Sequence, residues 1–116
     1  DLHACMADGE ISGSGIEVSG RVKLRVSVTQ RFNISTPFVE TKSKFMIISS
    51  EKTLEAAIRK GVALTCEMLQ KSFKINFQDA YRLASISCDV GICQIVNPMV
   101  TVKICIPKPL LKQAMK

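Results

Sequence analysis

The spacing of the apolar residues changes in this chain from every second residue to every third and fourth, and that change limits the folds that the chain can adopt. From residue 16 to residue 29 apolar and polar side chains alternate, so that Ile16 and Val18 share a face with the valines that follow. A period of two residues predicts a half-buried strand, with a hairpin or bend at Ser19-Gly20. From residue 54 to residue 72 the apolar residues recur at spacings of three and four, which predicts an amphipathic helix.

Caps and turn residues predict the remaining elements. A Ser or Thr is expected to cap the first helix, and Asn76 followed by Asp79 resembles a capping box that begins a second helix over about residues 77–87. Apolar runs predict further extended stretches at about residues 37–48, 89–96 and 99–106. Asn97-Pro98 is a turn dipeptide between the last two. This order predicts an α+β fold, in which an extended antiparallel β portion is followed by two helices and a closing β-hairpin.

Length and composition are those of a folded domain. The chain has 116 residues, of which 47% are apolar and 22% are charged, so it can bury enough surface to exclude intrinsic disorder. No apolar run approaches the roughly 20 residues that a membrane span requires. We therefore expect one unit over residues 1–116, in which residues 1–48 are mostly β with an acidic motif and residues 49–116 are α+β.

The distribution of charge and the cysteines indicate which partners and which cellular compartment to expect. The net charge is +6, yet residues 1–17 carry four acids and no Lys or Arg, and the longest basic run elsewhere is Arg59-Lys60. Scattered bases argue against a nucleic-acid footprint and against a membrane partner. The five cysteines form no C-x-x-C pair, and several lie in apolar runs, as at Cys105. This pattern predicts reduced thiols and a cytoplasmic protein.

Potential ligands are dense only in the first ten residues. Alternate residues of an extended segment share a face, which groups Asp1 with His3 and Asp8 with Glu10. If Gly9 folds the second pair back beside the first, one imidazole and several carboxylates surround a point that suits zinc or another divalent ion with an open position for water. A polar turn with one surface histidine is the alternative. A Cys5–His3 nucleophile pair is a further alternative that we disfavour.

The same segment resembles the signature of the acetamidase/formamidase family. The matching residues are Asp1, His3, Ala4, Asp8, Gly9, Glu10, Gly15, Glu17 and Val18. The stretches 80–83, 89–90 and 94–98 also resemble the C-terminal part of that family. The chain is thus similar to the C-terminal portion of a longer enzyme. It has Ala7 where the family usually has Gly, which costs about 1 kcal/mol if that position needs a positive φ.

The resemblance implies a function and a set of roles. It implies metal-dependent hydrolysis of short aliphatic amides, such as formamide or acetamide, to ammonia and a carboxylate. Asp1 and His3 are implied metal ligands, either Asp8 or Glu10 completes the set, and the other of these two is the general base. We assign Asp8 as the ligand and Glu10 as the base, with zinc as the metal. Glu17 is implied to hold the amide nitrogen or to support a ligand, although a solvated strand carboxylate is the alternative.

The resemblance also implies that the chain does not act alone. Its acidic segment is polar and rich in Gly, so the walls of a substrate pocket are expected from an N-terminal portion of a longer chain or from a second copy in a homo-oligomer. The alternative function is a non-catalytic α+β assembly domain or an inactive fragment of the enzyme.

Overall fold

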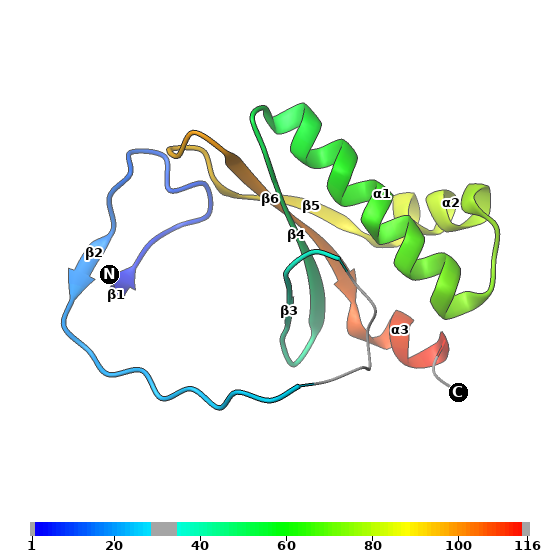
Figure 1. The fold of residues 1–116 in the computed structure, drawn as a ribbon, viewed down its shortest axis with the longest axis horizontal. Coiled ribbons are helices and arrows are strands. Elements are labelled where there is room, and N and C mark those ends of the chain that lie inside the picture. The colour runs from blue at the N-terminus through cyan, green and yellow to red at the C-terminus, as the bar shows by residue number, and fades with distance from the viewer. Residues whose placement is uncertain (1, 29–34, 115–116) are drawn as a thin grey trace.

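The computed structural model describes residues 2–28 and 35–114 (Figure 1), which form a four-stranded sheet with helices and a separate two-stranded sheet. The larger sheet is antiparallel, with strand order β3-β4-β6-β5. Its strands are β3 (Phe38–Glu40), β4 (Lys44–Glu51), β5 (Asp89–Gln94) and β6 (Val100–Pro107). The smaller sheet pairs β1 (Leu2–Cys5) with β2 (Ile16–Val18). The α+β prediction is confirmed.

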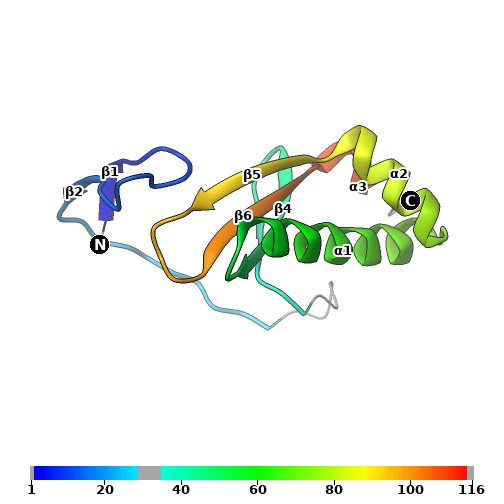
Figure 2. The same ribbon diagram turned by 90° about the horizontal axis from the view of Figure 1, so that it is seen from above.

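Helices cover one face of the larger sheet, as Figure 2 shows from above. They are α1 (Leu54–Phe73), α2 (Phe77–Ser87) and the short α3 (Lys108–Ala114). Alternate residues of the central strands face them, so that Phe45, Ile47, Ile104 and Ile106 are buried against α1. A Cβ at Gly61 would lie 3.0 Å from Ile104, so this glycine lets α1 approach the sheet closely.

Both predicted helices are confirmed, because their signals are local. The Thr53 side chain accepts a hydrogen bond from the Ala56 backbone N–H, and Asn76 accepts one from the backbone N–H of Asp79. The first helix ends where Lys74 takes a left-handed conformation, at φ 55°. The closing hairpin of β5 and β6 is also confirmed, with Asn97-Pro98 between its strands.

The predicted half-buried strand over residues 16–29 is wrong for most of its length. Only Ile16–Val18 is a strand, and residues 19–28 run on in extended form without a hairpin at Ser19-Gly20. Val26 and Val28 are 91% and 98% exposed. A strand needs a hydrogen-bonding partner and a surface to cover its apolar face, and the described residues provide neither here. Residue 29 lies outside the described residues.

Two smaller differences have local causes. The predicted run over residues 37–48 is divided into β3 and β4, because the Thr41 hydroxyl accepts the backbone N–H groups of Ser43 and Lys44 and closes a turn. The sequence predicts no helix after residue 106, whereas the structure has α3 there. Pro109 lies in the first turn of α3, where its missing N–H has no intrahelical partner to lose. Among the helices described here, none has the length and apolar character that crossing a membrane requires.

The fold makes a testable distinction between the core and the exposed extended segment. Replacing Val26 by Ser should change the free energy of unfolding by less than about 0.5 kcal/mol, because that side chain contacts little. Replacing Ile104 by Ala should lower it by about 2–5 kcal/mol, because Ile104 is 1% exposed and packs under α1. Urea unfolding followed by circular dichroism measures both. A large loss for Val26→Ser would show that residues 19–28 are packed in solution.

Candidate functional site

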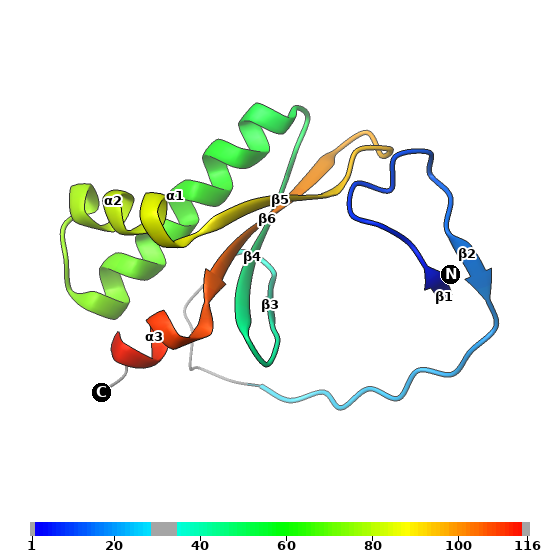
Figure 3. The same ribbon diagram turned by 180° about the vertical axis from the view of Figure 1, so that it is seen from behind.

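The acidic loop, residues 6–15 between β1 and β2, lies against the end of the β5–β6 hairpin (Figure 3). The backbone of Gly9 forms an isolated parallel bridge with that hairpin. The Gly9 N–H donates to the Cys93 carbonyl at 3.0 Å, and the Ile95 N–H donates to the Gly9 carbonyl at 3.0 Å. Gly9 has φ +97°, which only glycine adopts without strain. The loop is therefore held in one place by its backbone, although its side chains are mostly exposed.

Asp8 is tied to the middle of the sheet by an ion pair. The ammonium Nζ of Lys103, on β6, lies 2.7 Å from each of the two carboxylate oxygens of Asp8. The hydrogen bond to Asp8 raises the pKa of Lys103 above its ordinary value, and burial opposes this rise. A lysine ammonium is charged at neutral pH in any case. Because its pKa is raised here, the stability that the pair contributes is lost as the pH rises through that raised pKa.

Glu10 has an unusual backbone conformation. Its φ is +44°, in the left-handed region that costs a residue with a Cβ roughly 1–2 kcal/mol. The loop supports this conformation with two hydrogen bonds: the Glu10 N–H donates to the Ala7 carbonyl, and the Gly13 N–H donates to the Glu10 carbonyl. Glu10 is half-buried, whereas Asp8 beside it is exposed. Such strain is common at functional sites, so Glu10 is a candidate for chemistry.

His3 and Glu17 face each other across the small sheet. They are directly opposed in the β1–β2 register, so their side chains lie on the same face. The His3 ring also packs over Gly15, where a Cβ would lie 2.7 Å from its Cδ2 atom. Glycine at that position therefore leaves room for the imidazole. A carboxylate opposite a histidine is well placed to accept the N–H of the imidazole.

The structure places two of the predicted site residues opposite each other and pairs a third with a lysine that the sequence analysis did not name. His3 lies opposite Glu17, and Asp8 contacts Lys103. Across residues 2–28 and 35–114, no three His, Cys, Asp or Glu side chains form a group that could hold a metal ion. Gly9 pairs with β5, and whether Asp8 or Glu10 completes a metal site with His3 stays a prediction. Asp1 lies outside the described residues, so its role stays a prediction.

Sequence reasoning missed Lys103, although the sequence carried a signal. Lys103 is the one charged residue between Val100 and Pro107, in a run that is otherwise apolar apart from Thr101. A lysine in the middle of a strand that is paired on both edges is partly buried, and burying its charge costs free energy unless an acid lies near it. The acid is 95 positions away, and spacing could not identify it. Ala7, by contrast, has no positive φ, since Glu10 and Lys74 are the described non-glycine residues that do, so replacing the family's glycine there causes no strain.

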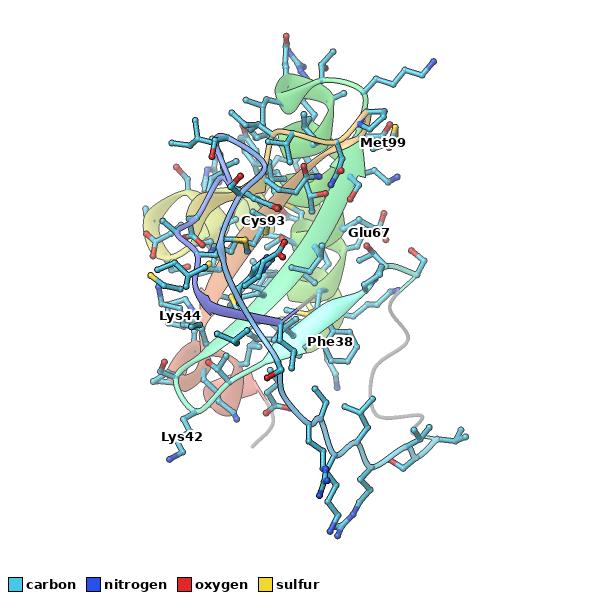
Figure 4. All side chains as sticks on the ribbon, turned by 90° about the vertical axis from the view of Figure 1, so that its left-hand side faces the viewer. Phe38, Lys42, Lys44, Glu67, Cys93 and Met99 are labelled. Carbon is cyan, nitrogen blue, oxygen red and sulfur yellow. The ribbon has the colours of Figure 1, made fainter. Side chains whose placement is uncertain are left out.

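The cysteines play no part in an activated pair. All five are free, as expected. Cys93, which lies behind the acidic loop in Figure 4, has its thiol pKa raised by burial, although the charge of Lys103 opposes this. A thiol with a raised pKa is protonated at neutral pH and is a weak nucleophile. Cys5 is exposed on β1, two residues after His3. A β-bulge lies between them, so that Cys5 pairs with Ile16 whereas His3 pairs with Glu17.

Two hollows among the described residues lie elsewhere in the molecule. A groove of about 700 Å³ runs between α1 and α2, where Phe77 and Tyr81 stack with ring centroids 6.0 Å apart. A second hollow of about 240 Å³ lies beneath Tyr81 and beside Cys88. The residues that line both belong to the helices and the large sheet, so neither hollow includes the acidic loop.

Comparison with solved structures places this fold beside amidases. The acetamidase from Bacillus halodurans matches 97% of the chain at 31% identity with a TM-score of 0.91, and the chain covers 38% of its length. A predicted acetamidase/formamidase from Thermoanaerobacter tengcongensis matches 97% at 32% identity with a TM-score of 0.92, again over 38% of its length. The acetamidase from Yersinia enterocolitica matches 94% at 30% identity with a TM-score of 0.78, over 33% of its length.

These matches confirm the resemblance to the acetamidase/formamidase family that the N-terminal motif predicts, over nearly the whole chain. The chain spans less than two-fifths of the length of those proteins, which is consistent with the predicted C-terminal portion. Neither a family model nor a curated protein matches the chain.

The strain at Glu10 can be measured. Glu10→Gly should raise the free energy of unfolding by about 0.5–1 kcal/mol, because glycine removes the left-handed penalty at φ +44°. Glu17→Gly is the matched control: Glu17 is in an extended strand, so the same change should lower stability by about 0.5–1 kcal/mol. Denaturant unfolding of both variants decides the question. Equal losses would mean that Glu10 is not held in the left-handed conformation.

Proposed function

We propose that this chain is the C-terminal portion of an amidase that hydrolyses short aliphatic amides, such as formamide or acetamide, to ammonia and a carboxylate. The observation that carries the proposal is the match of 97% of the chain to two acetamidase or acetamidase/formamidase structures at TM-scores of 0.91 and 0.92. The acidic motif that prompted the resemblance lies within that matched fold. The remaining three-fifths of such an enzyme would supply the walls of the substrate pocket.

The proposal includes a divalent metal ion, zinc foremost. The donor chemistry fits: His3 offers an imidazole with Glu17 opposite to orient it, and the loop offers two carboxylates. Asp1 and His3 would hold the ion, with Asp8 or Glu10 completing the set. When bound, such an ion lowers the pKa of a water molecule and polarises a carbonyl group.

The other steps of the reaction are assigned to residues of this chain. Amide hydrolysis forms a bond between a water oxygen and the carbonyl carbon, breaks the C–N bond, and moves a proton from the water to the leaving nitrogen. Glu10 is the proposed general base that takes this proton and returns it to the nitrogen. Its fixed backbone conformation would keep its carboxylate in place between the two transfers. Glu17 would orient His3 or hold the amide nitrogen.

One observation favours the alternative of a non-catalytic assembly domain. Residues 19–28 form a long exposed segment with apolar side chains at every second position, a pattern typical of a strand that pairs with another chain. In this alternative the acidic loop is a structural turn. Measurements of metal binding and of ammonia release distinguish the catalytic function from the assembly function.

The metal proposal predicts a sharp effect at His3. The wild-type chain should bind Zn²⁺, and His3→Ala should weaken that binding more than tenfold, because the chain has no second histidine. Glu17→Gln should weaken it about tenfold, as expected for a residue that orients a ligand. Isothermal titration with Zn²⁺ measures both, and Glu67→Gln on the exposed face of α1 is the control. Unchanged affinity in His3→Ala would remove His3 from the ligand set.

The functional proposal predicts a difference between the chain and a complete enzyme. A longer chain that includes this sequence should release ammonia from formamide at an enzymatic rate, at or above about 1 per second. The isolated 116-residue chain should be much slower, because its acidic loop is exposed to solvent. An ammonia-release assay with formamide and acetamide tests both. A metal-loaded longer chain that hydrolyses neither amide would contradict the proposed function.

A further inference from the structure

We propose that Lys103 is a positioning residue that clamps Asp8, so that Asp8 anchors the acidic loop and Glu10 is left as the reactive carboxylate of that loop. The role given to Glu10 rests on the proposed function, whereas the clamp itself does not. Of the two loop carboxylates, Asp8 is therefore the anchor, and it is neither a metal ligand nor a base.

The contact geometry supports a clamp. Lys103 Nζ lies 2.7 Å from both Asp8 oxygens, so the ammonium bridges the carboxylate instead of touching one side of it. The Lys103 side chain is 20% exposed, although Asp8 is 72% exposed, so the lysine reaches the pair from within the sheet. An ammonium held there already neutralises the charge of Asp8. A divalent cation at Asp8 would have to share its oxygens with a like charge.

The sheet is built to hold this lysine. Lys103 pairs with Gly91 on β5 and with Ile48 on β4, so it lies in the interior of the sheet rather than at an edge. It points away from α1, because its neighbours Val102 and Ile104 are the residues that face the helices. A Cβ at position 91 would lie 2.9 Å from Lys103 Cε and 3.2 Å from Cγ. Glycine at 91 therefore leaves the space in which the stem of Lys103 lies.

The clamp and the backbone bridge act on adjacent residues of the loop. Lys103 holds Asp8, and the hairpin holds Gly9 through the Cys93 carbonyl and the Ile95 N–H. The next residue is Glu10 with its positive φ. Because the two residues before Glu10 are both held by the sheet, few other backbone conformations are open to Glu10. This is how Lys103 acts on Glu10 without touching it.

The test measures amide hydrogen exchange in the 116-residue chain. In Lys103→Met the Gly9 and Ile95 amides should exchange about two- to five-fold faster, the change expected from losing a partly exposed ion pair. Lys103→Arg should restore slow exchange, since a guanidinium also bridges a carboxylate. Lys108→Met is the matched control, because Lys108 is 26% exposed and lies 2.6 Å from a Glu40 oxygen at a different site. The Ile104 amide in the core reports whether each variant is folded.

A double variant tests the partner. Asp8→Asn should speed exchange as much as Lys103→Met does, and the two changes together should add nothing further. Additive effects, or an unchanged exchange rate in Lys103→Met, would overturn the clamp. Failure of Lys103→Arg to restore slow exchange would also overturn it, because a role in packing alone would not depend on the charge.

Zn²⁺ titration separates anchor from ligand. If Asp8 is an anchor, Lys103→Met binds Zn²⁺ no more tightly than the wild type, and Asp8→Asn binds it as tightly as the wild type does. Tighter binding in Lys103→Met would mean that the ammonium competes with the metal for Asp8, which overturns the assignment. If the wild type binds no Zn²⁺ and a longer chain hydrolyses no amide, the proposed function fails while the exchange results still decide the clamp.

Discussion

Strand β6 is the element on which the rest of the structure depends, because it is hydrogen-bonded along both edges and uses both of its faces. On one face Val102, Ile104 and Ile106 are buried under the helices. On the other face Lys103 reaches the acidic loop, which is the first part of the chain. Residues 95 positions apart are thus joined through one strand, so the position of the candidate site is fixed by the same pairing that builds the core.

The parts of this fold that could be predicted from the sequence are those with local signals. The bounds of α1 and α2 are predicted to within a residue, because their period, Thr53 and Asn76 all act within one or two turns. The short α3 is not predicted. The strand over residues 19–28 could not be predicted correctly from alternation alone. Alternation shows which side chains favour burial, but the surface that buries them need not lie in the same 116 residues. The candidate site shows the same division. His3 and Glu17 came from the motif, whereas Lys103 became visible only through pairing across the sheet.

The face of the sheet away from the helices is only partly covered. Val39 on β3 lies on that face, since it pairs with Met46, and it remains exposed. Val90 and Ile92 on the edge strand β5 share the helix face with Ile104 and Val102, yet they are exposed as well. The extended segment over residues 19–28 and the acidic loop are exposed as well. Solved amidases share this fold at TM-scores of 0.91 and 0.92 and are more than twice as long as the chain. Their additional residues are the natural source of the missing cover in the proposed enzyme.

The conformation of Glu10 links stability to the proposed chemistry. A left-handed φ costs free energy in the isolated turn, so it persists only where the surroundings hold it. Here the surroundings are the Gly9 bridge to β5 and the pair between Asp8 and Lys103, both of which depend on the large sheet being formed. The free energy that stabilises the core therefore also maintains the strained loop. An amidase gains from such an arrangement, because a base that is already in place need not be ordered when the amide arrives.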